Sequence, residues 1–183
     1  MKIEVKNTKL LFLYRIFLFK NLLFKTRKSE LKTIVVALNM KKRKERIEYV
    51  YDEAIKYINA YYSDDLCKFE NNQCIAQRND GNGNISGCCR LCSLVTDKGC
   101  SSCNLACKLI YCKTALGNLK KLKLRDIPIL RCFSIFQLMV LRSSFFNTRE
   151  EILKDLNYGL VYSLFRNIKK EIQLHLYIIK KGL

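Results

Sequence analysis

The sequence has few of the residues on which catalytic sites usually depend. It contains a single histidine, His175, together with one proline, seven glycines and no tryptophan. A cysteine nucleophile needs a neighbouring base, and His175 lies far from the cysteines and is expected to be a surface or half-buried residue. No glycine-rich phosphate loop, nucleophile elbow or zinc-protease His-Glu motif is present, and Glu70, three residues after Cys67, has no deaminase motif around it. These absences weigh against an enzyme, and no catalytic residue is predicted.

A continuous apolar run long enough to cross a membrane is missing from the N-terminal stretch. Arg15 and Lys20 interrupt Leu10–Phe24, whereas a membrane span needs about 18–20 mostly apolar residues. The small-residue cleavage site of a secretory signal is also absent before Glu30. We expect a helix or helix pair that packs into the body and extends its basic head groups to water, with peripheral membrane contact through Leu10–Phe24 as the alternative. The expected location is cytoplasmic, with membrane association as the second option.

Acidic residues are scarce, since 16 Asp and Glu stand against 34 Lys and Arg and the formal net charge is +18. The basic excess lies in two arms. Residues 1–60 hold 15 basic and 6 acidic side chains and residues 113–183 hold 14 and 5, whereas residues 61–112 hold 5 of each. Such an excess favours phosphate polymers or anionic lipid head groups as partners. The alternative is a genome rich in Lys, Ile and Asn, in which surface positions drift toward lysine.

Two short basic runs are the candidate contacts for an acidic partner. Nucleic acid is the first candidate and an acidic protein the second. The alternative interpretation of both runs is a solvated face or a linker. The residues predicted to contact nucleic acid or another anion are Lys41, Lys42, Arg43, Lys44, Lys120, Lys121, Lys123 and Arg125.

Nine of the ten cysteines lie between Cys67 and Cys112, and this density requires a chemical reason. Disulfides suit an even number of cysteines but belong to secreted chains, and this sequence lacks a convincing signal peptide. Inert buried thiols explain the isolated Cys132 but hardly nine cysteines in one segment. Metal binding explains the short spacings directly, because the sulfurs of a Cys-x-x-Cys turn converge on one ion and two such pairs complete a tetrahedron. Metal binding is therefore the preferred interpretation.

Eight of the cysteines divide into two sets of four thiols. A glycine-rich hinge at 78–87 lies between Cys74 and Cys88. Zinc is favoured over an iron–sulfur cluster, because zinc suits paired knuckles and the spacing matches no ferredoxin pattern. Gly99 suits the turn that the first set requires, and Arg90, Lys98, Lys108 and Lys113 are expected to lower nearby thiol pKa values. The first set is Cys89, Cys92, Cys100 and Cys103, the second is Cys67, Cys74, Cys107 and Cys112, and Cys88 is a further option.

The run CCRLC…KGCSSCNLACKLIYC resembles that of uncharacterised bacterial cysteine-cluster proteins, which are regarded as zinc or iron chelators. The resemblance covers Cys67–Cys112, about a quarter of the chain, and depends on the cysteine spacing and on the GC…L-x-CK…C phrase that begins at Gly99. It implies metal binding and no particular activity.

Apolar periodicity predicts a helix before the cysteine segment. Leu31–Met40 is too short to assign by periodicity alone. From Arg46 onward the pattern is clear, and the helix is expected to end near Ser63. The residues on its apolar face are Ile47, Val50, Tyr51, Ala54, Ile58, Tyr61 and Tyr62.

Helices are also predicted after Cys112. Asp126 and Pro128 suit a helix start, and Ile129–Phe146 is so apolar that it should be a helix buried together with Cys132, with membrane or partner contact as the alternative. Thr148 and Glu151 form a capping-box pattern that opens a helix, which Gly159 can end. Leu160–Ile179 is amphipathic, with Arg166, Lys169, Lys170 and Glu171 largely outside.

These patterns together predict a mainly helical protein with a small irregular cysteine-rich metal-binding insert. The expected regions are a basic helical region at 1–63, a cysteine-rich module at 64–113 and a basic helical region at 114–183, all within one compact domain. The preferred function is a non-enzymatic zinc-binding protein with a basic surface for an acidic partner. The alternatives are an iron–sulfur redox or metal-handling protein and a membrane-surface accessory protein, and the oligomeric state is left open.

Overall fold

The structure of the chain is a computed structural model. It describes residues 28–62, 66–70, 73–75, 95–96, 99–100, 104–145 and 147–181. Within these ranges the side chains of residues 28, 29, 31, 95, 96, 99, 100, 170, 171, 174, 175 and 177–181 are not described. The predictions for Leu10–Phe24 and for the hinge at 78–87 lie outside the described residues.

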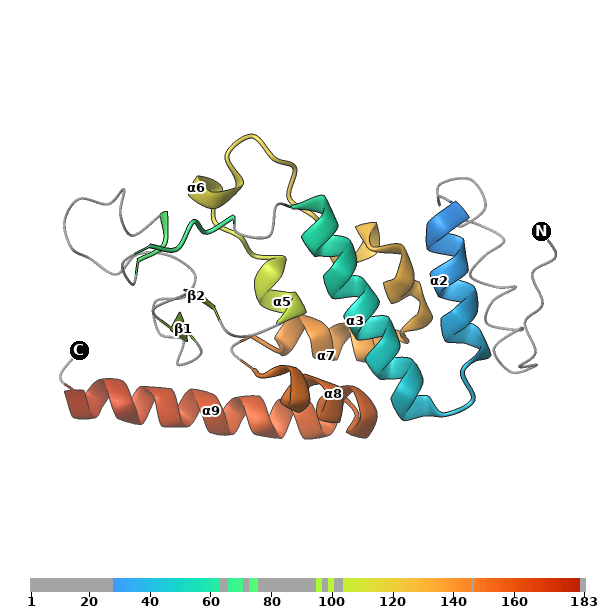
Figure 1. The fold of residues 1–183 in the computed structure, drawn as a ribbon. Coiled ribbons are helices and arrows are strands. Elements are labelled where there is room, and N and C mark those ends of the chain that lie inside the picture. Colours follow the sequence, from blue (N-terminus) through green and yellow to red (C-terminus); the bar gives the residue numbers. More distant parts are fainter. Residues whose placement is uncertain are drawn as a thin grey trace.

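Helices dominate the described part of the chain, as the sequence predicts (Figure 1). A short antiparallel sheet pairs β1 (Val95–Thr96) with β2 (Gly99–Cys100). The 3-10 helices are η1 (Leu124–Asp126) and η2 (Pro128–Cys132). The α-helices are α2 (Lys28–Asn39), α3 (Arg43–Tyr61), α5 (Leu105–Lys108), α6 (Lys113–Leu116), α7 (Ile135–Ser143), α8 (Arg149–Tyr158) and α9 (Leu160–Lys181).

α3 lies at the centre of the helical body, and α2, η2, α5 and α8 pack around it. Its apolar face is buried as the periodicity predicts, and it joins side chains of the surrounding elements in one hydrophobic cluster. The helix begins at Arg43, within the basic run that the sequence places at its start. One detail differs from the prediction, since Tyr61 is 43% exposed although Tyr62 is buried. The predicted place of Tyr61 in the core is therefore wrong. The buried residues of α3 are Ile47, Val50, Tyr51, Ala54, Ile55 and Ile58.

α2 is the element that periodicity could not assign. Ile34, Ala37 and Leu38 are buried on it, and the helix packs against α3 and η2. The stretch is helical because these three residues share one side at spacings of three and four, which a strand would divide between two faces.

The segment Ile129–Phe146 is not the single buried helix that its composition predicts. η2 ends at Cys132, the backbone is extended at Phe133 and Ser134, and α7 begins at Ile135. Ser134 and Gln137 form a capping box, in which the N–H of Gln137 donates to Ser134 Oγ at 3.3 Å and the N–H of Ser134 donates to Gln137 Oε1 at 2.9 Å. This box starts a new helix and so explains the break.

Burial along this segment also differs from the prediction. Ile135 and Phe136 are exposed on α7, whereas Val140 and Leu141 are fully buried. Pro128 occupies the first turn of a helix as expected, but that helix is the 3-10 helix η2.

The start of α8 confirms the capping-box prediction. Thr148 Oγ1 accepts the N–H of Glu151 at 3.3 Å, and Glu151 Oε2 accepts the N–H of Thr148 at 2.9 Å. Gly159 ends α8 with φ 102, a conformation that glycine adopts without a steric penalty, and α9 begins at the next residue.

Arg149 ties the first turn of α8 to α3. Its Nε donates to Asp52 Oδ1 at 2.9 Å, and its Nη2 donates to Asp52 Oδ2 at 2.7 Å and to Glu48 Oε1 at 2.8 Å. Hydrogen bonds that it donates to the carboxylates of Asp52 and Glu48 raise the pKa of Arg149, so the guanidinium is always charged. A two-pronged contact of this kind sets the orientation of α8 on α3.

α9 is turned the opposite way from its predicted orientation. Arg166, expected outside, donates from Nη2 to the buried carboxylate of Asp155 and from Nη1 to the carbonyl of Glu151 at 2.9 Å. The Asn167 amide donates to the carbonyl of Ser143 at 2.7 Å. Polar side chains therefore face α7 and α8. The large apolar residues left exposed on α9 are Val161, Leu164, Phe165, Ile168, Ile172 and Leu176.

None of the described helices is long and apolar enough to cross a membrane, and α9 is included in that finding. Lys169 is exposed as predicted. The side chains of Lys170 and Glu171, which were also expected outside, are among those not described.

The buried pair of Asp155 and Arg166 gives the first prediction. Burial raises the pKa of Asp155, and the guanidinium of Arg166 opposes that rise. Arg166→Met removes the opposing charge, so we expect a loss of about 3–5 kcal/mol in unfolding free energy at neutral pH, measured by urea denaturation. A carboxyl group with a raised folded-state pKa stabilises the fold only while it is protonated. The deficit should therefore shrink as the pH falls through that pKa.

Arg43→Met is the matched control, because Arg43 is an exposed helical arginine. We expect it to change stability by less than about 0.5 kcal/mol at any pH. If the loss in unfolding free energy caused by Arg166→Met stays constant with pH, Asp155 is not the group that loses its partner in this variant.

Candidate metal centre

A short hairpin lies between the two Cys-x-x-Cys pairs of the first predicted ligand set. β1 and β2 run antiparallel, with Val95 opposite Cys100 and Thr96 opposite Gly99. The chain thus reverses direction inside the loop 93–99, where the sequence predicts a tight turn. This reversal between the pairs is the first requirement for a single ion to receive ligands from both.

Most of that set has no described geometry. Cys88, Cys89, Cys92 and Cys103 lie outside the described residues, and only the backbone of Cys100 is described. The ligand assignment of the first set, and the role of Cys88, therefore stay predictions.

A closed turn joins Cys67 to Cys74, the first two members of the second set. Glu70 and Gln73 exchange backbone hydrogen bonds at 3.0 and 2.9 Å, and the N–H of Ile75 donates to the carbonyl of Cys67 at 2.8 Å. Cys74 is buried and Cys67 half-buried. The backbone therefore brings the two cysteines to the same end of one turn.

Asn104 fixes the point at which the cysteine segment returns to the helical body. Its side chain is fully buried. Nδ2 donates to the carbonyls of Ser144 and Asn147 at 2.6 and 3.0 Å, and Oδ1 accepts the N–H of Cys107 at 3.0 Å. The amide thus caps α5, which carries Cys107, and joins it to the turn between α7 and α8.

Tyr62, at the C-terminal end of α3, holds the other side of the module. Its hydroxyl accepts the N–H of Leu122 at 2.7 Å and donates to the carbonyl of Lys120 at 3.1 Å. Burial raises the pKa of Tyr62, so the hydroxyl keeps its proton for the second bond. The ring meets Tyr111 edge to face, with 5.4 Å between the centroids. Because Tyr111 directly precedes Cys112, this contact places Cys112 beside the end of α3.

The second set is not gathered into one site. Cys112 caps α6, its Sγ accepting the N–H of Ala115 at 3.4 Å. In the part of the chain that the structure describes, no three Cys, His, Asp or Glu side chains lie close enough to hold one ion. No disulfide joins the described members, Cys67, Cys74, Cys107 and Cys112, to one another. Their geometry does not fit a four-thiol centre, and the second set stays a prediction without geometric support.

Two further residues named from the sequence have defined surroundings. Lys108, expected to act on nearby thiols, donates from Nζ to Asn59 Oδ1 of α3 at 2.7 Å. Cys132 packs partly buried against the core. Burial raises the pKa of its thiol to about 12, with Arg46 acting in the opposite direction. A thiol with this pKa is protonated at neutral pH, in agreement with the interpretation of Cys132 as inert.

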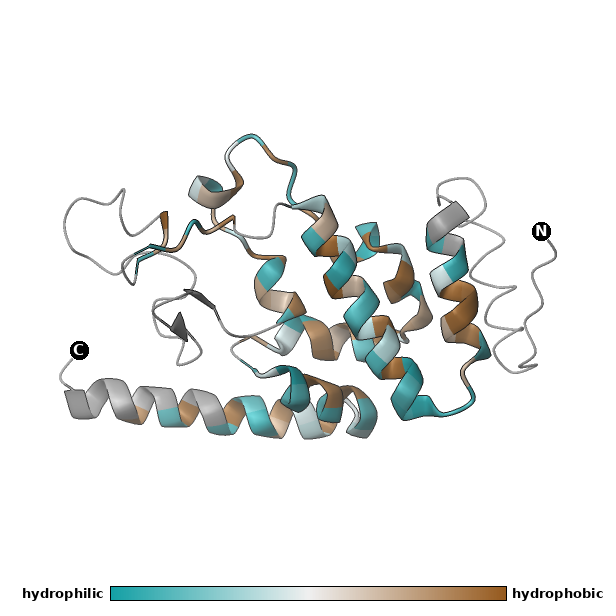
Figure 2. Cartoon of the chain, viewed as in Figure 1, coloured by the Kyte–Doolittle hydropathy of each residue, from teal (hydrophilic) through white to brown (hydrophobic). Residues whose placement is uncertain are grey.

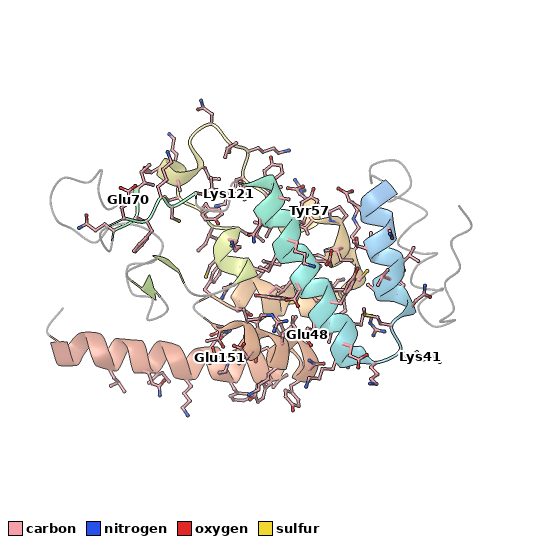
Figure 3. All side chains as sticks on the ribbon, viewed as in Figure 1. Lys41, Glu48, Tyr57, Glu70, Lys121 and Glu151 are labelled. Atoms are coloured by element: carbon pink, nitrogen blue, oxygen red, sulfur yellow. The ribbon has the colours of Figure 1, made fainter. Side chains whose placement is uncertain are left out.

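The two predicted basic runs do not form one surface. The run Lys41–Lys44 lies exposed at the N-terminal end of α3, and Lys42 pairs there with Glu45 at 2.8 Å. The other run, Lys120–Arg125, lies at the opposite end, where the carbonyl of Lys120 and the N–H of Leu122 are bonded to Tyr62. α3 has 19 residues, so its ends lie about 28 Å apart. Figure 3 shows Lys41 and Lys121 at these two ends.

A pocket of about 290 Å³ opens beside the second run. Lys121 and Lys123 line it together with Arg142, which comes from α7. The sequence did not indicate Arg142 as part of this site, because Arg142 belongs to another element and is simply a polar residue within an apolar segment there. The apolar residues lining the pocket are Ala106, Leu109, Ile110, Leu122, Leu124, Leu141 and Phe145.

The chain matches no family model, no curated protein and no solved structure. The resemblance to cysteine-cluster chelators therefore stays a prediction.

Asn104 gives the second prediction. Asn104→Asp keeps the oxygen that caps α5 but replaces the amide donor by an acceptor facing the carbonyls of Ser144 and Asn147. We expect a loss of about 3 kcal/mol or more in unfolding free energy, because buried polar groups are left without donors. Urea denaturation measures the change.

Asn118→Asp is the matched control, since it makes the same chemical change at an exposed asparagine. We expect a change below about 0.5 kcal/mol there. Equal losses in the two variants would mean that added charge, and not the buried amide, sets the effect.

Proposed function

We propose that the protein is a non-enzymatic zinc-binding protein whose cysteine-rich module lies beside a basic surface for single-stranded nucleic acid. The proposed ligands are Cys89, Cys92, Cys100 and Cys103. The observation that carries the metal assignment is the reversal of the chain between the two pairs, with Val95 opposite Cys100. The resemblance to cysteine-cluster chelators agrees with it.

Chain length allows the two pairs to meet. Cys92 precedes Val95 by three residues and Cys103 follows Cys100 by three residues. Paired Cα atoms of adjacent strands lie about 5 Å apart, and three residues span at most about 10 Å. Cys92 and Cys103 therefore start from neighbouring points and are equally far along the chain from the paired residues Val95 and Cys100. Zinc bound there would tie the hairpin ends together and replace a hydrophobic core that so short a segment lacks.

The body supplies fixed points on either side of the proposed centre. Asn104 directly follows Cys103 and is held by three hydrogen bonds. Tyr62 fixes the chain five residues before Cys67 and also contacts Tyr111. The module is therefore tied to the body at both ends, and the proposed zinc would order the residues between them.

The basic surface is the run Lys120–Arg125 together with Arg142. Lys121, Lys123 and Arg142 line a pocket whose other lining residues are apolar. Its volume, about 290 Å³, lies at the lower end of the range for small-molecule pockets. Apolar walls beside cations suit an unstacked base and its phosphates, which favours a single strand over a duplex.

Metal content is the third prediction. Protein purified without oxygen should be colourless and hold at least one zinc per chain by elemental analysis. Replacing one ligand from each pair, as in Cys89→Ser with Cys100→Ser, should lower zinc affinity at least tenfold, because a tetrahedral site loses half of its thiolates.

Cys132→Ser is the matched control, since Cys132 lies against the core and apart from the module. Its zinc content should equal that of the unaltered protein. A brown protein with equal iron and sulfide would replace zinc by the iron–sulfur alternative, and a metal-free protein would remove the metal assignment.

Nucleic-acid binding is the fourth prediction. The triple variant with Lys120, Lys121 and Lys123 replaced by Gln should bind a random single-stranded oligonucleotide more weakly. The slope of log affinity against log salt should also become about 2 units shallower, since each lost phosphate contact accounts for about 0.7. Fluorescence anisotropy at several salt concentrations measures both quantities.

A second triple variant, with Lys41, Lys42 and Lys44 replaced by Gln, loses the same charge at the far end of α3. We expect its salt slope to be nearly unchanged. Equal effects in the two triple variants would assign binding to net charge alone, and a salt-independent affinity would argue against phosphate as the partner.

A further inference from the structure

α9 exposes a continuous row of large apolar side chains. Phe165 is 71% exposed and Val161 67%, and the row continues to Leu176, 61% exposed. The spacing of the row, at residues 161, 165, 168, 172 and 176, follows one face of an α-helix. Figure 2 shows hydrophobic residues along this helix, which lies at the edge of the molecule.

The opposite face of α9 is firmly held, so the row cannot turn inward without breaking buried contacts. Arg166 donates to buried Asp155 and to the carbonyl of Glu151, and Asn167 donates to the carbonyl of Ser143 at 2.7 Å. Ser163, one turn before Arg166 and Asn167 on the same side of the helix, is also fully buried. Among the described elements α9 packs on α7 and α8 through this polar face.

The exposed area lies at the upper end of what a monomer usually leaves open. Six large apolar side chains at 45–71% exposure amount to roughly 600 Å². Tyr158 and Tyr162 extend the patch at the N-terminal end of α9, with their ring centroids 5.3 Å apart. A patch of this size on one side of a straight helix is an interaction surface.

The positive charge of the chain indicates whether a second copy or a lipid surface would cover this row. The chain carries +18, so two copies meeting face to face would bring together like charges. Within α9 the sequence holds Arg166, Lys169, Lys170, Lys180 and Lys181 against the single acid Glu171. Lys169 is exposed on α9 and Lys154 on the adjacent α8. An apolar row accompanied by cations is complementary to a surface that is apolar beneath a layer of negative charge.

We propose that α9 lies in the plane of an anionic lipid bilayer surface, with Val161, Phe165, Ile168, Ile172 and Leu176 among the acyl chains. The apolar side chains insert to the depth of the head groups, while Lys169 stays level with the lipid phosphates. The helix does not cross the bilayer. This surface is separate from the predicted contact through Leu10–Phe24 and from the basic run Lys120–Arg125.

Vesicle cosedimentation of the full chain tests the proposal. The unaltered protein should bind vesicles of phosphatidylcholine with phosphatidylserine and bind far less to phosphatidylcholine alone. Phe165→Gln combined with Ile172→Gln should lower binding to the anionic vesicles at least about tenfold, because two inserted side chains become polar. Both residues are exposed, so the thermal unfolding temperature should not change. The single variant Ile168→Gln should also lower binding to the anionic vesicles, but by less than the double variant.

Val36→Gln combined with Leu119→Gln is the matched control. These residues are 40% and 48% exposed and belong to α2 and to the chain after α6, away from α9. Binding should stay within twofold of the unaltered protein. The proposal is overturned if the unaltered protein does not bind anionic vesicles or if the α9 double variant binds them equally well. It is also overturned if that variant changes only self-association in sedimentation velocity, which would assign the row to a second copy.

Discussion

Burial of one face of α3 is the interaction on which the rest of the body depends. Ile47, Val50, Ala54 and Ile58 are almost fully buried, and burial of each large aliphatic side chain is worth about 1.5–3 kcal/mol. α2, η2, α5 and α8 are arranged around this helix. Tyr51 shows how packing and hydrogen bonding combine, because its ring is buried in the same face while its hydroxyl accepts the N–H of Leu105 at 3.1 Å.

The module is joined to this body by apolar packing and by polar contacts. Leu66, Leu105 and Leu109 belong to the hydrophobic cluster of the body. Asn104 satisfies two carbonyls and one N–H in a fully buried position, and Tyr62 bonds to both Lys120 and Leu122. Buried hydrogen bonds of this kind are costly to break, since each group left unpaired loses its full hydration. They fix where the cysteine segment leaves and re-enters, and the proposed zinc would then order what lies between.

The orientation of α9 leaves apolar surface open. Six large apolar side chains stay 45–71% exposed on it, whereas its buried side carries an ion pair whose attraction is largely offset by desolvation. The helix nevertheless directs Arg166 to Asp155 and leaves its apolar row in contact with solvent. In our proposal a partner covers this surface, and an anionic bilayer is complementary to its apolar row and to the positive charge of the chain. The basic run beside the pocket, at the far end of α3 from Lys41, serves a different ligand in our proposals.

Some features of the protein follow from the sequence by itself. The capping box of Thr148, the stop at Gly159 and the buried face of α3 depend on residues within one or two turns, so local spacing predicts them. The same holds for the cysteine spacings that predict metal binding. The capping box of Ser134 and Gln137 is equally local, although the apolar composition of 129–146 concealed it. Only the tertiary structure decided that Arg142 joins the second basic run. It also decided that the polar face of α9 is the buried one. These outcomes depend on which distant groups meet, as Arg166 meets Asp155, and a periodic pattern shows that a helix has two faces without showing which of them the body covers.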